Sequence, residues 1–167
     1  MPDATTSDRD RLFAEASAEL GFAPDGEIKI GGRYTSLVRD GRTIYLSGQI
    51  PRIGDRVVVT GCVGADVTLA DAQRAAQVCT LRALALLQRE LGSLASLKAV
   101  LRLTVYVHCS ADFTQHSEVA DGASDLLWRV LGPAGVHTRT SVGVCQLPKN
   151  AAVELDLIAL AATDPES

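Results

Sequence analysis

Two long amphipathic segments flank one strongly alternating segment, and this arrangement constrains the fold more than any other feature. The segments from Thr68 to about Leu91 and from about Phe113 to Leu131 carry apolar residues at helical spacing. Between them, residues 99–108 alternate between apolar and mixed positions, which is typical of a strand with one buried face. We therefore expect two long helices that cover one face of a mixed β-sheet in a two-layer α+β domain.

Local signals predict where several elements begin and end. Thr68 and Asp71 form a capping box at the start of the first long helix, and Gly92 stops it. Asp40 and Gly41 predict the turn of a hairpin whose strands are Thr35–Arg39 and Thr43–Ser47. Further strands are predicted at Arg56–Thr60, Arg139–Cys145 and Val153–Leu160. We find no reason in the sequence for Gly122 inside the second helix.

The chain divides into one main domain and two short ends. Residues 8–20 read as a helix that is ended by Gly21, and we expect it to pack on the main body as an addition. We assign residues 1–29 to an N-terminal extension with one helix, residues 30–162 to the main domain, and residues 163–167 to a loose tail.

Composition narrows the functional class. The chain has 167 residues, of which 47% are hydrophobic and 22% charged, and its net charge is −4. No basic patch points to nucleic acid, and no apolar run reaches the length of a membrane span. The N-terminus does not resemble a signal peptide, so we expect a cytoplasmic protein. Four cysteines and three histidines lack metal-binding spacing, which favours buried free thiols and no metal site.

The strand around Arg139 has two different faces. Arg139, Ser141, Gly143 and Cys145 point one way, because side chains alternate along a strand. The mixed faces of the three long strands carry the apolar or aromatic side chains of Val100, Tyr106 and Ile158 beside the charged side chains of Arg102, Glu154 and Arg139. Such a face suits a symmetric oligomer that covers it and binds ligands between its subunits. The alternative is that these residues simply face solvent, which antiparallel sheets permit.

Three motifs in order resemble the signatures of one family. Tyr45-Leu-Ser-Gly-Gln-Ile-Pro51 is followed by Arg139-Thr-Ser-Val-Gly-Val-Cys-Gln-Leu-Pro-Lys149 and by Val153-Glu-Leu-Asp-Leu-Ile-Ala159. Together they resemble the Rid family, also called YjgF-like or L-PSP-like, over about residues 30–160. The N-terminal helix and the segment Asp121-Gly-Ala-Ser-Asp-Leu-Leu127, which resembles an Asn-Gly-Ala-Ser-Asp-Leu-Leu segment, point to a longer-chain branch of this family.

The resemblance implies a fold and an activity. The fold is chorismate-mutase-like, and three subunits form a homotrimer around a central barrel, with clefts between the subunits. Family members with the arginine hydrolyse 2-imino and 2-enamino acids, such as 2-aminoacrylate, to 2-keto acids and ammonia. The implied protein is a cofactor-independent deaminase that needs no metal. Its partners are a small imino or keto acid and its own subunits, with no nucleic acid or membrane.

The resemblance also implies site residues. Arg139 pairs with the substrate carboxylate, a role that the planar guanidinium suits. Glu154 positions or activates water, and Ser47 contacts the leaving amine or that water. Tyr34 closes the cleft, and Gly48 lets the backbone approach the ligand.

Departures from the family pattern and other functions stay open. Ser141 replaces a cysteine that is common two residues after the arginine, and backbone groups at that position are expected to bind substrate. Arg33 adds a cation near Tyr34, and we hypothesise that it meets a second acid group on a ligand. Alternative functions are a non-catalytic binder of small carboxylates and, less favoured, an endoribonuclease. A chorismate-mutase-like isomerase is weaker still, since a fold alone is poor warrant for function.

Overall fold

A five-stranded mixed sheet forms one layer of the molecule. The computed structural model describes residues 5–165, and the strand order is β1-β2-β7-β5-β6. The strands are β1 (Leu37–Asp40), β2 (Thr43–Gln49), β5 (Leu97–His108), β6 (Thr138–Val144) and β7 (Val153–Ala161). Only β5 and β6 are parallel to each other, whereas the other neighbours are antiparallel. The predicted α+β class is confirmed.

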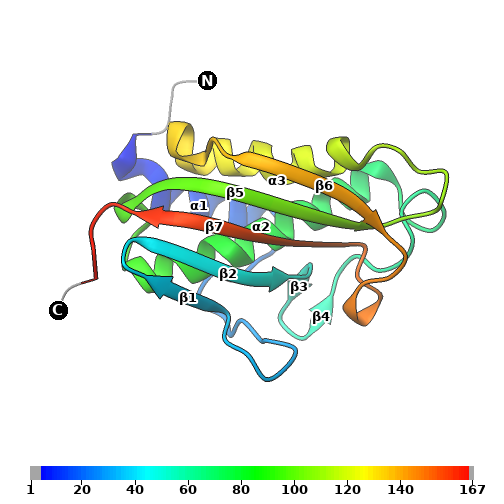
Figure 1. Cartoon of the computed structure of the whole chain (residues 1–167), viewed down its shortest axis with the longest axis horizontal. Coiled ribbons are helices and arrows are strands. Elements are labelled where there is room, and N and C mark those ends of the chain that lie inside the picture. Colours follow the sequence, from blue (N-terminus) through cyan, green and yellow to red (C-terminus); the bar gives the residue numbers. More distant parts are fainter. Residues whose placement is uncertain (1–4, 166–167) are drawn as a thin grey trace.

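Three helices form the second layer on one side of this sheet (Figure 1). They are α1 (Arg9–Glu19), α2 (Leu69–Leu91) and α3 (His116–Leu131). Short 3₁₀ segments are η1 (Thr6–Asp8), η2 (Leu94–Ser96), η3 (Gly132–Gly135) and η4 (Pro148–Asn150). No helix in residues 5–165 is both long and apolar enough to cross a membrane.

The helix signals place α2 correctly and α3 only in part. The Thr68 hydroxyl oxygen accepts the backbone N–H of Asp71 at 3.2 Å, and Gly92 ends the helix with φ of 77°. Helix α3 begins at His116, three residues later than expected. The reason is a preceding turn in which the Phe113 N–H donates to the Ser110 carbonyl at 3.2 Å.

The predicted strand Arg56–Thr60 is wrong for most of its length. Only β4 (Arg56–Val57) is formed there, and it pairs with β3 (Arg52–Ile53) in a separate small hairpin. Thr60 makes an isolated bridge with Ala151 instead. These two short strands place the 52–57 loop beside the end of β2, next to a cavity described below.

A β-bulge in β5 reverses the expected faces at the start of this strand. We expected Ala99 and Leu101 on the core side with Leu103, and Val100 on the open side. The pairing of β5 with β7 shifts between Val100 and Arg102. Val100 is therefore buried at 1% exposure, whereas Leu101 is 41% exposed. From Leu103 onward the predicted alternation is confirmed.

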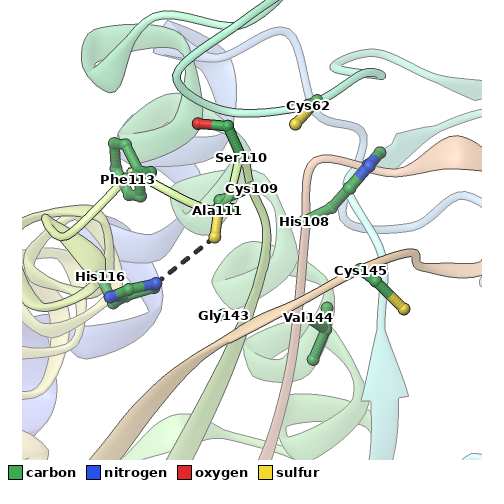
Figure 2. A pocket seen from close by; sticks show the side chains of 10 residues that line it. All are labelled: Cys62, His108, Cys109, Ser110, Ala111, Phe113, His116, Gly143, Val144 and Cys145. Carbon is green, nitrogen blue, oxygen red and sulfur yellow. Dashed lines mark hydrogen bonds between the residues drawn. The ribbon is translucent and has the colours of Figure 1, made fainter.

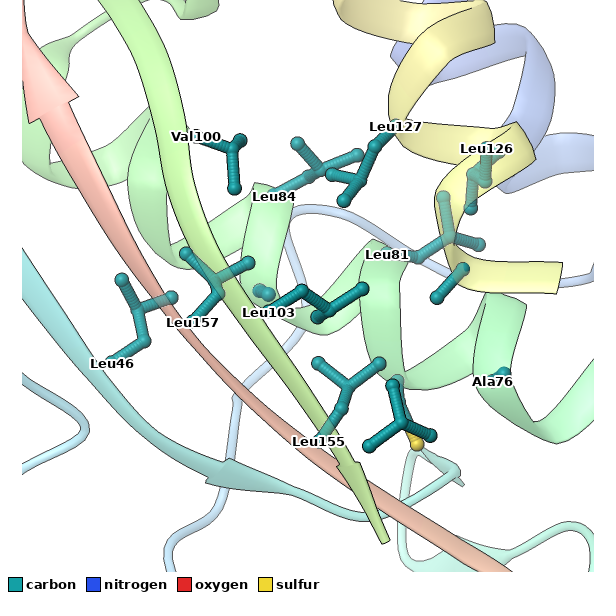
Figure 3. Packing of buried hydrophobic residues seen from close by; sticks show 14 of the residues in the cluster. Leu46, Ala76, Leu81, Leu84, Val100, Leu103, Leu126, Leu127, Leu155 and Leu157 are labelled. Atoms are coloured by element: carbon teal, nitrogen blue, oxygen red, sulfur yellow. The ribbon is translucent and has the colours of Figure 1, made fainter. Parts of the chain in front are cut away.

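The core lies between the sheet and the helices (Figure 3). Leucines of β2, β5 and β7 meet leucines and alanines of α2 and α3 there. Its labelled members are Leu46, Ala76, Leu81, Leu84, Val100, Leu103, Leu126, Leu127, Leu155 and Leu157, of which none is more than 5% exposed. The small buried residues on α2, among them Ala72, Ala75 and Ala76, let this helix lie close to the sheet.

The N-terminal helix α1 is anchored on the same layer. Phe13 and Ala16 are buried against the core. The guanidinium of Arg9 donates to the carbonyls of Leu94 and Leu97 at 3.2 and 2.7 Å. This helix therefore packs on the main body as expected, while the proposed domain boundary at residue 29 stays a prediction.

Gly122 marks the closest approach of the two long helices. A Cβ atom at this position would lie 2.5 Å from the backbone carbonyl oxygen of Gln73 on α2. Backbone atoms cannot rotate away as a side chain can, so glycine is required for the observed helix separation. This contact explains a residue for which the sequence alone offered no reason.

We predict that Gly122→Ala destabilises the protein by about 1–3 kcal/mol, because forced separation of packed helices costs more than the gain in helix propensity. Chemical denaturation would measure the free energy of unfolding. Glu118→Ala, an exposed change in the same helix, serves as the control and should stay within about 0.5 kcal/mol of the wild type. An unchanged or increased stability of Gly122→Ala would contradict the close-packing account.

Candidate functional site

Arg139 and Glu154 lie on opposite faces of the sheet. Arg139 is opposite Leu103 of β5, which is fully buried beneath the helices. Glu154 is opposite Tyr106 of β5, whose partner on β6 is Val142, a 40% exposed residue of the open face. The expectation that Arg139 and Glu154 share one face was therefore wrong. The parallel register of β5 and β6 aligns Arg139 with the helix-facing positions of β5.

The side chain of Arg139 is held against α3. Its Nη1 donates to Asp121 Oδ1 at 2.9 Å and to Ser124 Oγ at 2.8 Å. Its Nη2 donates to the backbone carbonyl of Ser117 at 3.3 Å. These bonds use three of the five N–H donors of the guanidinium. Among residues 5–165, the Nε–H and one Nη2–H have no protein acceptor, which leaves two donors for a carboxylate.

A chain of hydrogen bonds from Gly135 through His137 and Ser124 holds the Arg139 guanidinium in place. The His137 Nδ1 lies 2.6 Å from the carbonyl oxygen of Gly135, which can only accept a hydrogen bond. In the neutral ring, Nδ1 therefore carries the proton and Nε2 accepts from the Ser124 hydroxyl at 3.0 Å. The lone pairs of Ser124 remain free to accept from Arg139. The relay thus holds the guanidinium in place, while Asp121 partly neutralises its charge.

Glu154 lies in a small cavity at the end of β2. The cavity measures about 90 Å³, and Tyr34 and Gly48 line it together with Glu154. The Glu154 side chain packs so closely on Gly48 that a Cβ there would collide with its Oε1. Burial, and then the neighbouring Asp156 carboxylate, raise the pKa of Glu154. A raised pKa makes this carboxylate a stronger base than an exposed glutamate.

Ser47 precedes Gly48, which packs on Glu154, and Ser141 follows Arg139 along β6. The Ser47 hydroxyl donates to the Thr35 carbonyl at 2.6 Å, so its proton is already engaged and only its lone pairs are free. Ser141 lies two residues beyond Arg139 on the same side of β6, and it is half-buried. The structure therefore groups Tyr34 and Gly48 with Glu154, and Ser141 with Arg139. The catalytic role of Ser47 stays a prediction.

Several cations of the Glu154 cavity were missed in the sequence. Lys29, Arg52, Arg82 and Lys149 line it, whereas Arg33 does not. These residues come from four separate segments, so no local pattern joins them. Arg82 alone gave a signal, because it interrupts the otherwise apolar face of α2.

The partners of Arg139 were missed as well, although their spacing was informative. Ser117, Asp121 and Ser124 are four and three residues apart, so they lie on one face of α3. That face is directed at the edge strand β6.

A second cavity contains a thiol and an imidazole in contact (Figure 2). Cys109 Sγ lies 3.4 Å from His116 Nε2. A side chain at Gly143 would meet both groups, at 2.8 and 2.6 Å. Burial raises the pKa of the Cys109 thiol, which keeps it neutral. His116 is thus a hydrogen-bonded, partly buried residue at the start of α3.

The cysteines are free thiols, as expected, but only Cys79 is buried and Cys145 is exposed, whereas buried thiols were expected. All four cysteines, Cys62, Cys79, Cys109 and Cys145, are free. In the part of the chain that the structure describes, no three His, Cys, Asp or Glu side chains are grouped so that they could hold a metal ion.

Comparisons with known proteins agree with this fold and these motifs. A family model described as "YjgF/chorismate mutase-like, putative endoribonuclease" matches residues 17–161. Protein TCP17 of Trypanosoma cruzi is 43% identical over 126 residues, which cover 75% of this chain and 79% of that protein.

Two solved structures are similar over almost their whole length. Protein Atu1372 of Agrobacterium tumefaciens, described as of unknown function, is 35% identical with a TM-score of 0.82, and the match covers 93% of this chain and 96% of that one. A "putative endoribonuclease" of Shewanella oneidensis is 28% identical with a TM-score of 0.81, and the match covers 89% and 98%. The chain therefore belongs to the Rid family, the YjgF/chorismate-mutase-like proteins.

Proposed function

We propose that the protein hydrolyses 2-imino and 2-enamino acids of the 2-aminoacrylate type to 2-keto acids and ammonia, without a cofactor. The observation that carries this proposal is the Glu154 carboxyl, which is half-buried, has a raised pKa and packs on Gly48 in a small cavity. A second observation supports it. Arg139 is fixed by α3 and keeps two N–H donors for a carboxylate.

The proposed site lies between subunits. Within one chain Arg139 and Glu154 are separated by the sheet, so one substrate cannot contact both. Strand β6 is at the edge of the sheet, and a neighbouring subunit could place its own edge over the open face. That face exposes Val38, Tyr45 and Val142, at 55%, 48% and 40%. Covering apolar residues of this size favours an oligomer, which we propose is a homotrimer.

The reaction needs only positioning and proton transfer. Arg139 of one subunit holds the carboxylate of the iminium substrate. Ionised Glu154 of the next subunit takes a proton from water while the water oxygen bonds to C2 and the C=N electron pair moves to nitrogen. The proton then passes from Glu154 to the amine, and the C–N bond breaks to release NH3. As the keto group forms, Glu154 takes the hydroxyl proton and passes it to NH3, which becomes ammonium. One water is consumed, and one ammonium ion leaves.

The remaining predicted residues have positioning roles in this scheme. Tyr34 is 50% exposed at the cavity mouth and is free to cover a bound substrate. Gly48 leaves space for Glu154 and for the reacting carbon. Ser47 offers lone pairs to the leaving amine, and the backbone at Ser141 contacts the substrate carboxylate. An enamine substrate first takes up a proton at C3 from hydronium in the solvent, which converts it to the iminium ion on which water acts.

Two other functions make different predictions about turnover. A non-catalytic binder of small carboxylates would use the same groups but would not accelerate ammonia release. An endoribonuclease, which the descriptions of the family and of the Shewanella protein name with the word "putative", would cleave RNA. Ammonia release, measured in the experiments below, separates the deaminase from the binder.

We predict that Arg139→Lys lowers kcat/KM for 2-aminoacrylate roughly 10- to 100-fold, because a bidentate charge-assisted contact becomes a single one. Arg139→Ala should lose more. The measurement is imine hydrolysis above the spontaneous rate, with the exposed Arg56→Lys change as control. Equal rates for wild type and Arg139→Ala would refute the deaminase proposal, and no acceleration by the wild type would favour the binder.

Asp121→Asn should lower KM for carboxylate substrates about threefold, because the amide still accepts from Arg139 but no longer repels an anion. The resembling segment of the longer-chain branch has asparagine at this position. Steady-state kinetics at low and high salt provide the measurement, and the effect should shrink at high salt. An increase in KM would show that the Asp121 charge assists binding.

The raised pKa of Glu154 predicts an acid limb in the pH–rate profile. The base must be ionised, so kcat falls as the pH is lowered through the raised pKa, at a pH above the ordinary glutamate range of about 4.3. Asp156→Asn removes a neighbouring negative charge and should move this limb to lower pH. Glu154→Gln should abolish the limb together with most activity. A limb that stays in place in both variants would assign it to another group.

A further inference from the structure

The Glu154 cavity concentrates positive charge in a chain whose net charge is negative. The net charge of the protein is −4, yet Lys29, Arg52, Arg82 and Lys149 line this cavity against Glu154 alone. Lys29 is paired with Asp55. The other three cations have no carboxylate partner among the residues that the structure describes. This excess attracts an anion into the cavity.

Arg82 is the deepest of these cations. It is only 3% exposed, and burial lowers the pKa of its guanidinium. Its donors reach Gln49 Oε1 at 3.1 Å and the carbonyls of Arg52 and Lys29 at 3.2 and 3.0 Å. Neutral acceptors thus fix the guanidinium without cancelling its charge. These three hydrogen bonds leave two of the five N–H donors of the Arg82 guanidinium available. A buried charge without a counter-ion is costly, and a bound anion would offset that cost.

Two further cations at the cavity have unusual features, one in its hydrogen bonding and the other in its backbone. The Nε of Arg52 is buried and has no hydrogen-bond partner. Lys149 has a φ of 58°, which is unusual for a residue with a side chain. Such a backbone conformation costs energy and often occurs at functional positions. Here it belongs to a residue that lines the cavity together with Arg82.

The size and position of the cavity restrict the anion. A volume of about 90 Å³ equals the room of about three water molecules, which suits a carboxylate on a short stem. Glu154 and Gly48 line the same cavity. A carboxylate bound there is therefore attached, through a short stem, to the substrate carbon on which Glu154 acts. In the proposed reaction, the other carboxylate of this substrate is held by Arg139 of the neighbouring subunit.

We propose that the cavity binds a second carboxylate, and that the preferred substrates are dicarboxylic 2-imino acids with a short acidic side chain. This inference rests on the proposed deaminase function for the site as a whole. It assigns Arg52, Arg82 and Lys149 to recognition of the side-chain carboxylate. A neutral substrate of the same length would leave these cations unpaired and would be hydrolysed less efficiently.

The test compares 2-iminoglutarate with 2-iminopentanoate, each generated in place by an amino acid oxidase. Wild type should favour the diacid in kcat/KM by at least about tenfold, as expected for charge-assisted contacts. Lys149→Ala should reduce that preference about tenfold, because kcat/KM for the diacid falls more than kcat/KM for 2-iminopentanoate. Lys98→Ala, an exposed lysine outside the cavity, is the matched control and should keep the wild-type preference. Arg82 is left unchanged, because a buried variant could fail to fold.

A binding measurement separates failure of this inference from failure of the deaminase proposal. Calorimetry with 2-ketoglutarate and 2-ketopentanoate reports on the anion site without turnover. Hydrolysis of both imines with no diacid preference, or a preference that Lys149→Ala does not change, overturns the inference and leaves the deaminase intact. If neither imine is hydrolysed, the deaminase proposal fails. In that case, tighter diacid binding that is lost in Lys149→Ala supports the anion site, and equal binding of both keto acids overturns it.

Discussion

The packing of α2 and α3 on one face of the sheet determines what the rest of the chain can do. Because the helices cover the alternating leucines of β5 and β7, the other face of these strands is left open. Glu154 belongs to that open face, and Arg139 belongs to the helix-facing side of the edge strand. A site that uses both must therefore be completed by a second subunit. The oligomer is thus a chemical requirement of the proposed reaction as well as a way to cover apolar surface.

The two halves of the proposed site are stabilised in different ways. Arg139 is fixed by an ion pair with Asp121 and by a hydrogen-bond relay, which ends at Gly135 through Ser124 and His137. Glu154 is fixed by close packing on Gly48, and its pKa is raised by burial. One half therefore offers an ordered cation at a surface, and the other offers a base in a partly dry cavity. Such a division suits a substrate that has a carboxylate at one end and a reactive carbon beside it.

Much of the fold could be predicted from local chemistry. Thr68 and Gly92 bound α2 because capping depends on neighbouring residues alone, and the turn at Gly41 is equally local. The predictions failed where distant contacts decide the outcome. The bulge near Val100 depends on pairing with β7, and Gly122 has its reason on another helix.

The site shows the same division between local and distant causes. The motifs identified Gly48, Tyr34 and Glu154, which the structure brings into one cavity. They could not show that Arg139 faces the helices, since that follows from its register with β5. Nor could they show the cations around Arg82, which come from segments far apart in the sequence. Sequence motifs thus indicated the chemistry of the site, whereas its division between two faces became visible only in three dimensions.

The most direct test of the intersubunit site is complementation between two inactive variants. Arg139→Ala and Glu154→Gln would be unfolded together, refolded as a mixture and assayed for imine hydrolysis. If each site takes Arg139 from one subunit and Glu154 from the next, random assembly in equal amounts restores about a quarter of the wild-type activity per subunit. Each variant refolded alone should stay inactive. A mixture that forms mixed oligomers yet remains inactive would contradict a site shared between subunits.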